Sequence, residues 1–448
     1  MATIKLNGET FKPLLVNGAQ FLLNDIDRIN ALNVFPVPDG DTGTNMCLTI
    51  EGGVKEITSF SEENIGKMFK RLARSMTMSA RGNSGVILSQ FFKGMSNYLV
   101  DKEEADYHDF IEAFLSGSAR SYKVVQTPTE GTMLTVMREA AEYVKEHENE
   151  YSSIDDVLVN YVKAAQISLD NTPNLLPVLK EAGVVDSGGA GFVLIFEGML
   201  LALNGTILKH EEVSIEVEEE EEFEIIEKKY AIVAVSPSEG ISELLTSLEC
   251  DVIVSGGQTM NPSSDDFIHA FKKLKAEYIF VFPNNKNIYM AAAQAGKAYK
   301  AANVIIIPTK SVAQCYSALT LLDYSSDDYK EIENSFIEAT QNVITGSVTY
   351  AVRDTNLHGI EIHKNDYMTI IDGEIVASAA SKVEAIDNII SSIKDIEDKS
   401  VITLIYGVDM TEAEINEVTL FIKTKTPNLE IIEINGGQEV YSVIVAIE

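Results

Sequence analysis

Residues 36–45 read PVPDGDTGTN, and the chemistry of this segment governs what is expected of the whole N-terminal half. Asp39 and Asp41 stand two positions apart in a loop that Pro36 and Pro38 stiffen, so both carboxylates can face one hard cation. Oxygen ligands without a neighbouring Cys or His favour Mg²⁺. The alternative is a plain turn in which the two carboxylates cap the following helix.

Three further glycine-rich loops precede expected helices in the same half. They are RGNSG at 81–85, TEGT at 129–132 and DSGGAG at 186–191. Apolar residues recur at helical spacing, which predicts eight helices. The expected helices cover 11–26, 45–58, 62–79, 85–100, 106–126, 132–148, 154–170 and 190–204, with 173–183 as an irregular or short helical connection.

The order of these helices predicts where the four glycine loops lie. In an up-and-down bundle successive helices alternate in direction, so the second, fourth, sixth and eighth helices begin at the same end. The loops would gather there with free backbone N–H groups and the positive ends of four helix dipoles. This favours a phosphate-rich ligand over four structural turns. Together with Mg²⁺ it indicates a nucleotide and phosphoryl transfer, without a Walker-type phosphate loop.

Composition and charge narrow the class of protein. The 448 residues include 45% hydrophobic residues, enough for two or three packed domains. Lys and Arg number 35 against 68 Asp and Glu, and the net charge of −33 disfavours binding to nucleic acid or to an anionic membrane.

The cysteines and the N-terminus indicate a cellular location. Cys47, Cys250 and Cys315 lie far apart and are odd in number, which fits a reducing interior rather than a disulfide framework. The N-terminal residues lack a basic and then apolar signal. The apolar run 192–203 is too short to span a bilayer. We therefore expect a cytoplasmic protein without membrane insertion.

The chain changes character at an acidic segment. From Glu211 to Glu224 nine of fourteen residues are glutamate, which predicts an extended linker, or else an acidic docking arm. Beyond it, short β-branched runs alternate with helical patterns, which is typical of a parallel sheet with crossover helices. The expected strands cover 231–235, 252–254, 278–282, 304–307, 348–352, 367–371, 374–377 and 443–447.

Polar loops follow three of these strands, after Val254, Phe282 and Ile307. In open α/β sheets ligands bind at the carboxyl ends of parallel strands. The loop residues could form a polar pocket for an anionic or carbonyl group, or they could simply cap the next helices. They are Ser255, Thr259, Asn261, Asn284, Lys286, Thr309, Lys310 and Ser311.

Three motifs together resemble the nucleotide-binding domain of the dihydroxyacetone kinase family. They are NVFPVPDGDTGTNM at 33–46, ARGNSG at 80–85 and GVVDSGG at 183–189. The chain is similar in particular to the fatty acid kinase A family of Gram-positive bacteria, on four further motifs of its C-terminal half. These are SGGQTMNP at 255–262, PNNKN at 283–287, PTKS at 308–311 and TYAVRDT at 349–355.

The resemblance implies a multidomain α and α/β fold. An N-terminal eight-helix all-α barrel over 1–208 would bind the nucleotide and Mg²⁺, and 209–229 would form the acidic linker. An α/β domain with a parallel or mixed sheet would occupy 230–448. Members of the family carry a middle domain with Cys and His metal ligands; here only the acidic segment stands in its place.

The resemblance also implies the site residues. ATP or ADP would bind with Mg²⁺ at one end of the barrel, with Asp39 and Asp41 as the catalytic metal ligands and Asn33 as a third metal-ligand candidate. The phosphates would contact Thr42, Gly43, Thr44, Asn45, Ser84 and Gly85. The sugar and base would contact Gly131, Thr132, Asp186, Ser187 and Gly188.

The implied reaction moves the γ-phosphate of ATP to a fatty acid carboxylate presented by a fatty-acid-binding partner protein, giving an acyl phosphate. A carboxylate is already ionised near neutrality, so the site needs no strong general base. Two alternatives stay open: a kinase for dihydroxyacetone or another small hydroxyl substrate, and a non-catalytic nucleotide-binding regulator. The resemblance leaves a homodimer open as well.

Overall fold

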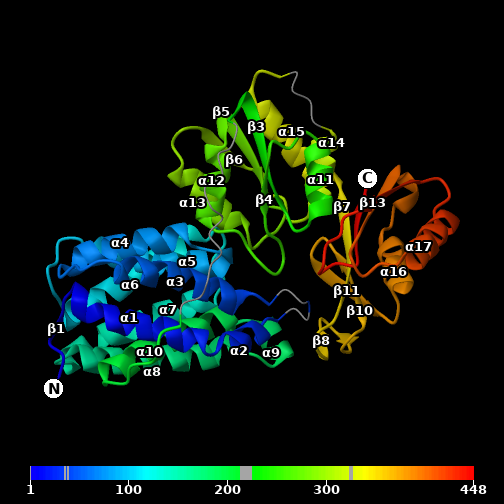
Figure 1. The fold of residues 1–448 in the computed structure, drawn as a ribbon. Coiled ribbons are helices and arrows are strands. Elements are labelled where there is room, and N and C mark those ends of the chain that lie inside the picture. The colour runs from blue at the N-terminus through cyan, green and yellow to red at the C-terminus, as the bar shows by residue number, and fades with distance from the viewer. Residues whose placement is uncertain (1, 35–36, 38–39, 212–224, 322–325) are drawn as a thin grey trace. The chain divides into compact units, whose positions relative to one another are not determined.

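The computed structural model describes all residues except 1, 35–36, 38–39, 212–224 and 322–325. It consists of two compact units (Figure 1). The helical unit is made of Met1–Val34 and Gly40–Glu220, and the α/β unit contains Glu221–Glu448. Most of the predicted acidic linker falls outside the described residues, so the domain boundaries at 208 and 230 stay predictions.

In the residues that the structure describes, the helical unit is a closed ring of eight long helices. They are α1 (Gly8–Leu23), α3 (Thr42–Thr58), α4 (Ile65–Met78), α5 (Gly82–Leu99), α6 (Tyr107–Val124), α7 (Met133–Glu146), α8 (Ile154–Leu175) and α10 (Ser187–Leu203). Each long helix packs against the next one in the chain, and α10 packs back against α1. The predicted eight-helix barrel is thereby confirmed.

Two short helices accompany the long ones, and only the first was not predicted, because 173–183 was expected as an irregular or short helical connection. Helix α2 (Ile26–Ala31) begins where the first helix was expected to end, because Asn24 and Asp25 turn the chain after Leu23. Helix α9 (Pro177–Ala182) lies in the expected connection. A two-stranded pair, β1 (Lys5–Leu6) with β2 (Ala105–Asp106), completes the unit.

Helix α8 runs further than expected, through Pro173 to Leu175. Proline has no N–H to donate to the carbonyl four residues earlier, which would leave the carbonyl of Leu169 without its helical partner. The Thr172 hydroxyl donates to that carbonyl at 2.7 Å. This side-chain bond replaces the missing backbone bond and lets the helix continue.

Aromatic side chains fill the centre of the barrel. Phe91, Phe114, Tyr161, Phe192 and Phe196 are all fully buried. The Phe114 and Tyr161 rings stack with centroids 4.2 Å apart, and the Phe91 ring meets the Phe192 ring edge-on at 5.1 Å. Pairs of this kind stabilise a core beyond the area that they bury. In the part of the chain that the structure describes, none of the helices has the length and apolar character needed to span a membrane.

The α/β unit begins with a parallel sheet. Strands β3 (Ile226–Ser236), β4 (Val252–Ser255), β5 (Leu274–Phe282) and β6 (Asn303–Ile306) are arranged in the order β4-β3-β5-β6, and all neighbours are parallel. The helices of this part are α11 (Glu239–Ser247), α12 (Ser264–Lys272), α13 (Tyr289–Ala298), α14 (Val312–Thr320) and α15 (Tyr329–Asn342). The alternation of strand and helix is as the sequence predicted.

A second, mixed sheet follows. Its strands are β7 (Ile344–Tyr350), β10 (Tyr367–Ile371), β11 (Glu374–Ala379), β12 (Val401–Tyr406), β13 (Glu430–Asn435) and β14 (Val443–Ile447), in the order β11-β10-β7-β14-β12-β13. Only β12 and β13 are parallel. Helices α16 (Lys382–Ser392) and α17 (Glu412–Lys425) and the hairpin of β8 (Thr355–Leu357) and β9 (Ile360–Ile362) complete the unit.

The two sheets share one hydrophobic core. Phe280 of the parallel sheet belongs to the same buried cluster as Ile405 and Ile444 of the mixed sheet. The predicted α/β architecture with a parallel or mixed sheet is confirmed, and its described residues form both a parallel and a mixed sheet. All three cysteines are buried and free, as expected for a chain without a disulfide framework.

The Tyr161 hydroxyl leads to a prediction about stability. It is buried in the aromatic core and has no hydrogen-bond partner among the described residues. Because an unsatisfied buried hydroxyl keeps its desolvation cost, Tyr161→Phe should raise the free energy of unfolding of the helical unit by about 1 kcal/mol. Urea-dependent hydrogen exchange of the α8 amides measures this change.

Tyr406→Phe is the matched control, because the Tyr406 hydroxyl is also buried but lies 3.2 Å from Thr419 Oγ1. In this variant the free energy of unfolding of the α/β unit should fall rather than rise. A loss of stability in Tyr161→Phe would mean that a buried water satisfies the Tyr161 hydroxyl.

Candidate functional site

The four glycine loops lie at one end of the barrel. The Ser187 hydroxyl at the start of α10 donates to Thr42 Oγ1 at the start of α3, over 3.3 Å. The N–H of Arg81, just before α5, donates to Thr49 Oγ1 in α3 at 3.2 Å. Asp186, just before α10, accepts a hydrogen bond from the N–H of Met133 at the start of α7. The starts of α3, α5, α7 and α10 therefore meet, as helix parity predicted.

At the start of α3 the capping residue is Asn30, from α2. Its Oδ1 accepts from the N–H of Gly43 at 2.8 Å and from that of Thr44 at 3.3 Å, and its Nδ2 donates to Thr44 Oγ1 at 3.0 Å. The Asp41 side chain occupies the N-cap position but makes no capping bond. The structure therefore contradicts the capping alternative for the Asp41 carboxylate, while Asp39 lies outside the described residues. No linear pattern marks Asn30, and the sequence analysis missed it.

Gly85 allows α3 and α5 to approach each other closely. A Cβ at this position would lie 2.2 Å from Thr49 Oγ1 and 3.1 Å from the carbonyl oxygen of Asn45. The Gly85 N–H donates to the Arg81 carbonyl at 3.1 Å and so continues the helix. The closeness of the two helices explains the glycine, while its contact with a phosphate stays a prediction.

Several backbone N–H groups at this end have no hydrogen-bond partner among the described residues. They belong to the first turns of three helices: Thr42 in α3, Ser84 in α5, and Ser187 and Gly188 in α10. Each N–H lies at the positive end of a helix dipole. Unpartnered first-turn amides on three converging helices are suited to an anion with several oxygens, such as a polyphosphate.

Asp186 ties the site together. Its Oδ2 accepts from the N–H of Gly189 at 2.6 Å, its carboxylate also accepts from the N–H of Met133, and its own N–H donates to Thr172 Oγ1 at 3.1 Å. One residue thus connects the starts of α10 and α7 with α8. Burial raises the pKa of the Asp186 carboxyl to about 6, against the effect of the two backbone hydrogen bonds.

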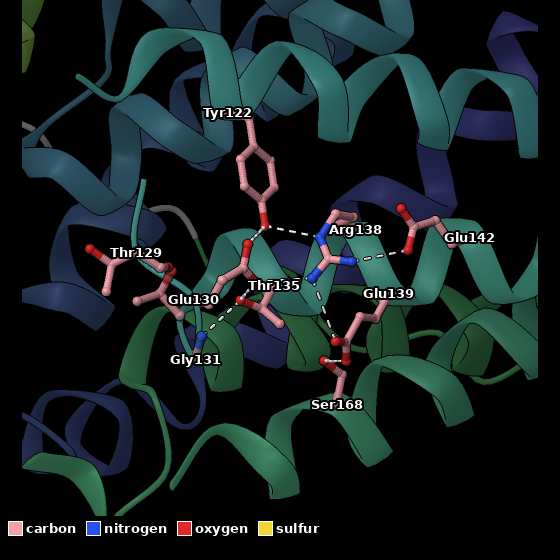
Figure 2. A network of polar contacts seen from close by, with 10 residues as sticks. Tyr122, Thr129, Glu130, Gly131, Thr135, Arg138, Glu139, Glu142 and Ser168 are labelled. Atoms are coloured by element: carbon pink, nitrogen blue, oxygen red, sulfur yellow. Dashed lines mark hydrogen bonds and ion pairs between the residues drawn. The ribbon is translucent and has the colours of Figure 1, made fainter. Parts of the chain in front are cut away.

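The third loop, Thr129–Thr132, differs from the other three because its polar groups are already engaged (Figure 2). Gly131 adopts a φ of 82°, and its N–H donates to Thr135 Oγ1 at 2.8 Å. The Thr132 hydroxyl donates to the carbonyl oxygen of Thr129 at 2.8 Å. The predicted contacts of Gly131 and Thr132 with a sugar or base stay predictions.

The metal ligands are only partly placed. Asp39 lies outside the described residues, and Asp41 is buried, with 7% of its surface exposed. Asn33 lies beside the loop, since a Cβ on Gly40 would be 3.8 Å from Asn33 Cβ. The described residues contain no cluster of three His, Cys, Asp or Glu side chains that could hold a metal. The set of Asn33, Asp39 and Asp41 therefore stays a prediction.

In the α/β unit the loops after the parallel strands are bonded to one another. Asn284 has a φ of 58°, its Nδ2 donates to the Val235 carbonyl at 2.8 Å, and its N–H donates to Thr309 Oγ1 at 3.0 Å. Ser311 caps α14 by accepting from the N–H of Gln314 at 3.2 Å. Ser311 thus supports the capping alternative, and Asn284 and Thr309 connect strand ends. A ligand pocket at this edge stays a prediction.

The two halves of the chain match two family models. Residues 36–201 match the DAK2 domain, and residues 231–448 match the fatty acid kinase A-like C-terminal domain. Over 554 aligned positions the chain is 33% identical to an uncharacterized protein of Staphylococcus epidermidis, with 99% of this chain and 100% of that protein covered. Because the chain has 448 residues, more than a hundred of those positions have no counterpart in it.

The chain is also similar to two solved structures. One is the dihydroxyacetone kinase from C. freundii in complex with AMP-PNP and Mg²⁺, with 20% identity, a TM-score of 0.35, and coverage of 43% of this chain and 33% of that chain. The other is DegV, a fatty acid binding protein from Bacillus subtilis, with 11% identity, a TM-score of 0.36, and coverage of 49% and 98%. Similarities at this level add nothing to the description of the site.

The third loop gives a prediction about glycine. Gly131 has a left-handed backbone conformation, and a Cβ on it would lie 2.8 Å from Leu176 Cβ. Gly183 is also left-handed, with a φ of 67°, but a Cβ there would have no atom within 4 Å. Gly183→Ala should lower the free energy of unfolding by about 1 kcal/mol through backbone strain alone. Gly131→Ala should lower the free energy of unfolding by about 1–3 kcal/mol more than Gly183→Ala does, because Leu175 and Leu176 must move.

The shift of the urea unfolding midpoint measures both variants. Equal losses would show that the segment at Leu175 and Leu176 yields without cost, and that Gly131 is required for its backbone conformation alone.

Asp186 gives a prediction about pH. The folded protein holds the Asp186 proton more tightly than the unfolded chain does, because burial raises the pKa to about 6 from a usual value of 3.8. The stability from this group is present at low pH and is lost as the pH rises through about 6. On going from pH 7 to pH 5, the wild type should therefore gain about 1 kcal/mol relative to Asp186→Asn.

Urea unfolding of both proteins at the two pH values gives this difference directly, because all other titrating groups are common to them. If the two stabilities change in parallel, Asp186 does not titrate in this range.

Proposed function

The chain belongs to the fatty acid kinase A-like family, and on that premise we propose that it is the nucleotide-binding kinase component of an acyl-phosphate-forming pair. It would use ATP and Mg²⁺ to transfer the γ-phosphate to a fatty acid carboxylate presented by a fatty-acid-binding partner protein. The observation that carries the proposal is the convergence, at one end of the barrel, of N–H groups from α3, α5 and α10 that have no partner among the described residues.

These N–H groups suit the β- and γ-phosphates of ATP. Thr42 and Ser187 contribute both an amide and a hydroxyl, with their oxygens 3.3 Å apart, and Ser84 and Gly188 add further amides from neighbouring helices. The amides carry no charge that phosphate would repel, and they do not ionise. Their positions are fixed before the nucleotide binds. Preorganised donors of this kind stabilise charge that develops on transferring oxygens without reorganising during the reaction.

The residues also suit Mg²⁺. Asp41 is a buried carboxylate that is not used as a helix cap, and Asn33 and Asp39 would complete a set of oxygen ligands on the same loop. When bound, Mg²⁺ would neutralise and orient the phosphate oxygens. The protein's own contribution is to hold Asp41 next to Thr42, so that the metal ligand and the first phosphate donor follow each other in the chain.

The acceptor is proposed to be a carboxylate because the four loops contain no histidine to act as a general base. A fatty acid carboxylate needs no deprotonation near neutral pH, whereas a sugar-type hydroxyl would benefit from a base. Attack of the carboxylate oxygen on the γ-phosphorus would break the bond to the bridging β–γ oxygen and leave ADP. The products are then an acyl phosphate and ADP, with no proton to be moved.

A second function is favoured by one observation. More than a hundred positions of the Staphylococcus epidermidis relative have no counterpart here. If those positions include the surface that engages the acyl-bearing partner, this chain would bind nucleotide as a regulator without turnover. Measuring ADP release with a purified fatty-acid-binding protein, with dihydroxyacetone, and with neither distinguishes the three functions, since each predicts a different pattern of stimulation.

The metal assignment gives a prediction for Asp41. Asp41→Asn should weaken Mg²⁺-dependent ATP binding at least about tenfold, because one carboxylate ligand and its charge are lost. Isothermal titration calorimetry with ATP, with Mg²⁺ and with a chelator, measures the effect. The control is Asp25→Asn, which removes an exposed carboxylate paired with Arg28 at 2.5 Å and should bind ATP as the wild type does.

Unchanged Mg²⁺-dependent affinity in Asp41→Asn would remove Asp41 from the metal site. Wild-type protein that takes up no ATP at all would end the kinase proposal as well as the regulator.

A further inference from the structure

A closed network of side chains holds the third glycine loop (Figure 2). Its centre is the Glu130 carboxylate, which receives hydrogen bonds on both oxygens. Oε1 accepts from the Tyr122 hydroxyl of α6 at 2.9 Å. Oε2 accepts from the Thr135 hydroxyl at 2.6 Å and from Arg138 Nη2 at 3.0 Å, both in α7. Two helices thus converge on a single loop carboxylate.

The direction of each hydrogen bond in this network is fixed. The Gly131 N–H can only donate, so Thr135 Oγ1 accepts it at 2.8 Å and turns its own hydrogen toward Glu130. Arg138 Nε can likewise only donate, so the Tyr122 hydroxyl accepts it at 3.1 Å and also points its hydrogen at Glu130. The hydroxyl hydrogens of Thr135 and Tyr122 therefore both point at the Glu130 carboxylate.

Arg138 supplies the only positive charge in this network. Its side chain is 34% exposed, and besides Glu130 it lies 3.1 Å from Glu142 and 3.6 Å from Glu139. Burial works to raise the pKa of the Glu130 carboxyl, but hydrogen bonds from Thr135, Arg138 and Tyr122 outweigh it and lower the pKa. Glu130 is therefore ionised, and it shares the positive charge of Arg138 with Glu139 and Glu142.

This pairing matters because the loop lies next to the converging helix starts. Thr132 leads directly into Met133, whose N–H is bonded to Asp186, and Ser187 begins the helix whose first amides are open. An ionised Glu130 without a cation would repel a polyphosphate bound at these amides. A carboxylate that is hydrogen-bonded and paired with a cation can instead hold the loop in place without repelling the polyphosphate.

We propose that Arg138 is a positioning residue of the nucleotide site, which holds and neutralises Glu130 and thereby fixes Thr129–Thr132 as one wall of that site. The inference rests on the proposed function, because it requires a nucleotide at the open helix starts. Arg138 touches neither the nucleotide nor the metal, and it acts through Glu130 and Thr135.

Lysine could not replace Arg138 in this role. Three different nitrogens of the guanidinium are engaged: Nε with Tyr122, Nη2 with Glu130 and Nη1 with Glu142. A single ammonium group cannot reach three partners in these directions at once. Arg138→Lys should therefore keep the charge balance but lose the fixed geometry, and its ATP affinity should fall between those of the wild type and Arg138→Gln.

The experiment compares ATP affinity by calorimetry in the full chain with Mg²⁺. Arg138→Gln should bind ATP about tenfold more weakly, the loss expected when one partner of a charged hydrogen-bonded pair is removed. The double variant Glu130→Gln with Arg138→Gln should recover most of this loss, because no uncompensated carboxylate is left in the loop. Glu142→Gln, which removes a partner of Arg138 that does not touch the loop, should bind as the wild type does.

The outcomes separate the inference from the proposed function. Absence of ATP binding by the wild type contradicts the proposed function. Wild-type binding with equal affinity in Arg138→Gln contradicts the inference alone, as does a double variant that stays as weak as the single one. If Arg138→Gln does not fold, Tyr122→Phe removes one donor to Glu130 without stranding a charge, and it should weaken ATP binding about threefold; unchanged affinity would then overturn the inference.

Discussion

The carboxylate of Asp186 is the interaction on which the open end of the barrel depends. It accepts N–H groups from the starts of both α10 and α7, and the N–H of the same residue is bonded to Thr172 in α8. Two positive helix ends would repel each other across this gap without a negative charge between them. The cost is the burial of that charge, which raises the pKa of Asp186 to about 6.

The four loops at this end of the barrel differ in whether their polar groups are already hydrogen-bonded within the described residues. The first amides of Thr42, Ser84, Ser187 and Gly188 have no partner in the described part of the chain. The amide of Gly131 is bonded to Thr135, and Glu130 anchors the whole loop to α6 and α7. Amides without a partner suit a ligand with negatively charged oxygens. A loop whose polar groups are already hydrogen-bonded suits a wall of the site that must keep its shape.

Much of this could be predicted from the chain alone. Apolar spacing predicted the eight helices, the alternation of strands and helices predicted the α/β unit, and parity predicted that the glycine loops meet. Those predictions succeed because they depend on the local period of side chains and on short connections, both of which are visible in the sequence.

The sequence by itself thus determined the eight long helices, the alternation of strands and helices in the α/β unit, and which loops share one end of the barrel. Only the tertiary structure decided which polar groups of those loops are already used. Asn30, rather than Asp41, caps α3, and Thr135 takes the Gly131 amide that was expected to face a nucleotide. The physical reason is that a hydrogen bond depends on distances of a few tenths of an ångström between side chains and backbone. Residue type and spacing alone do not specify such distances.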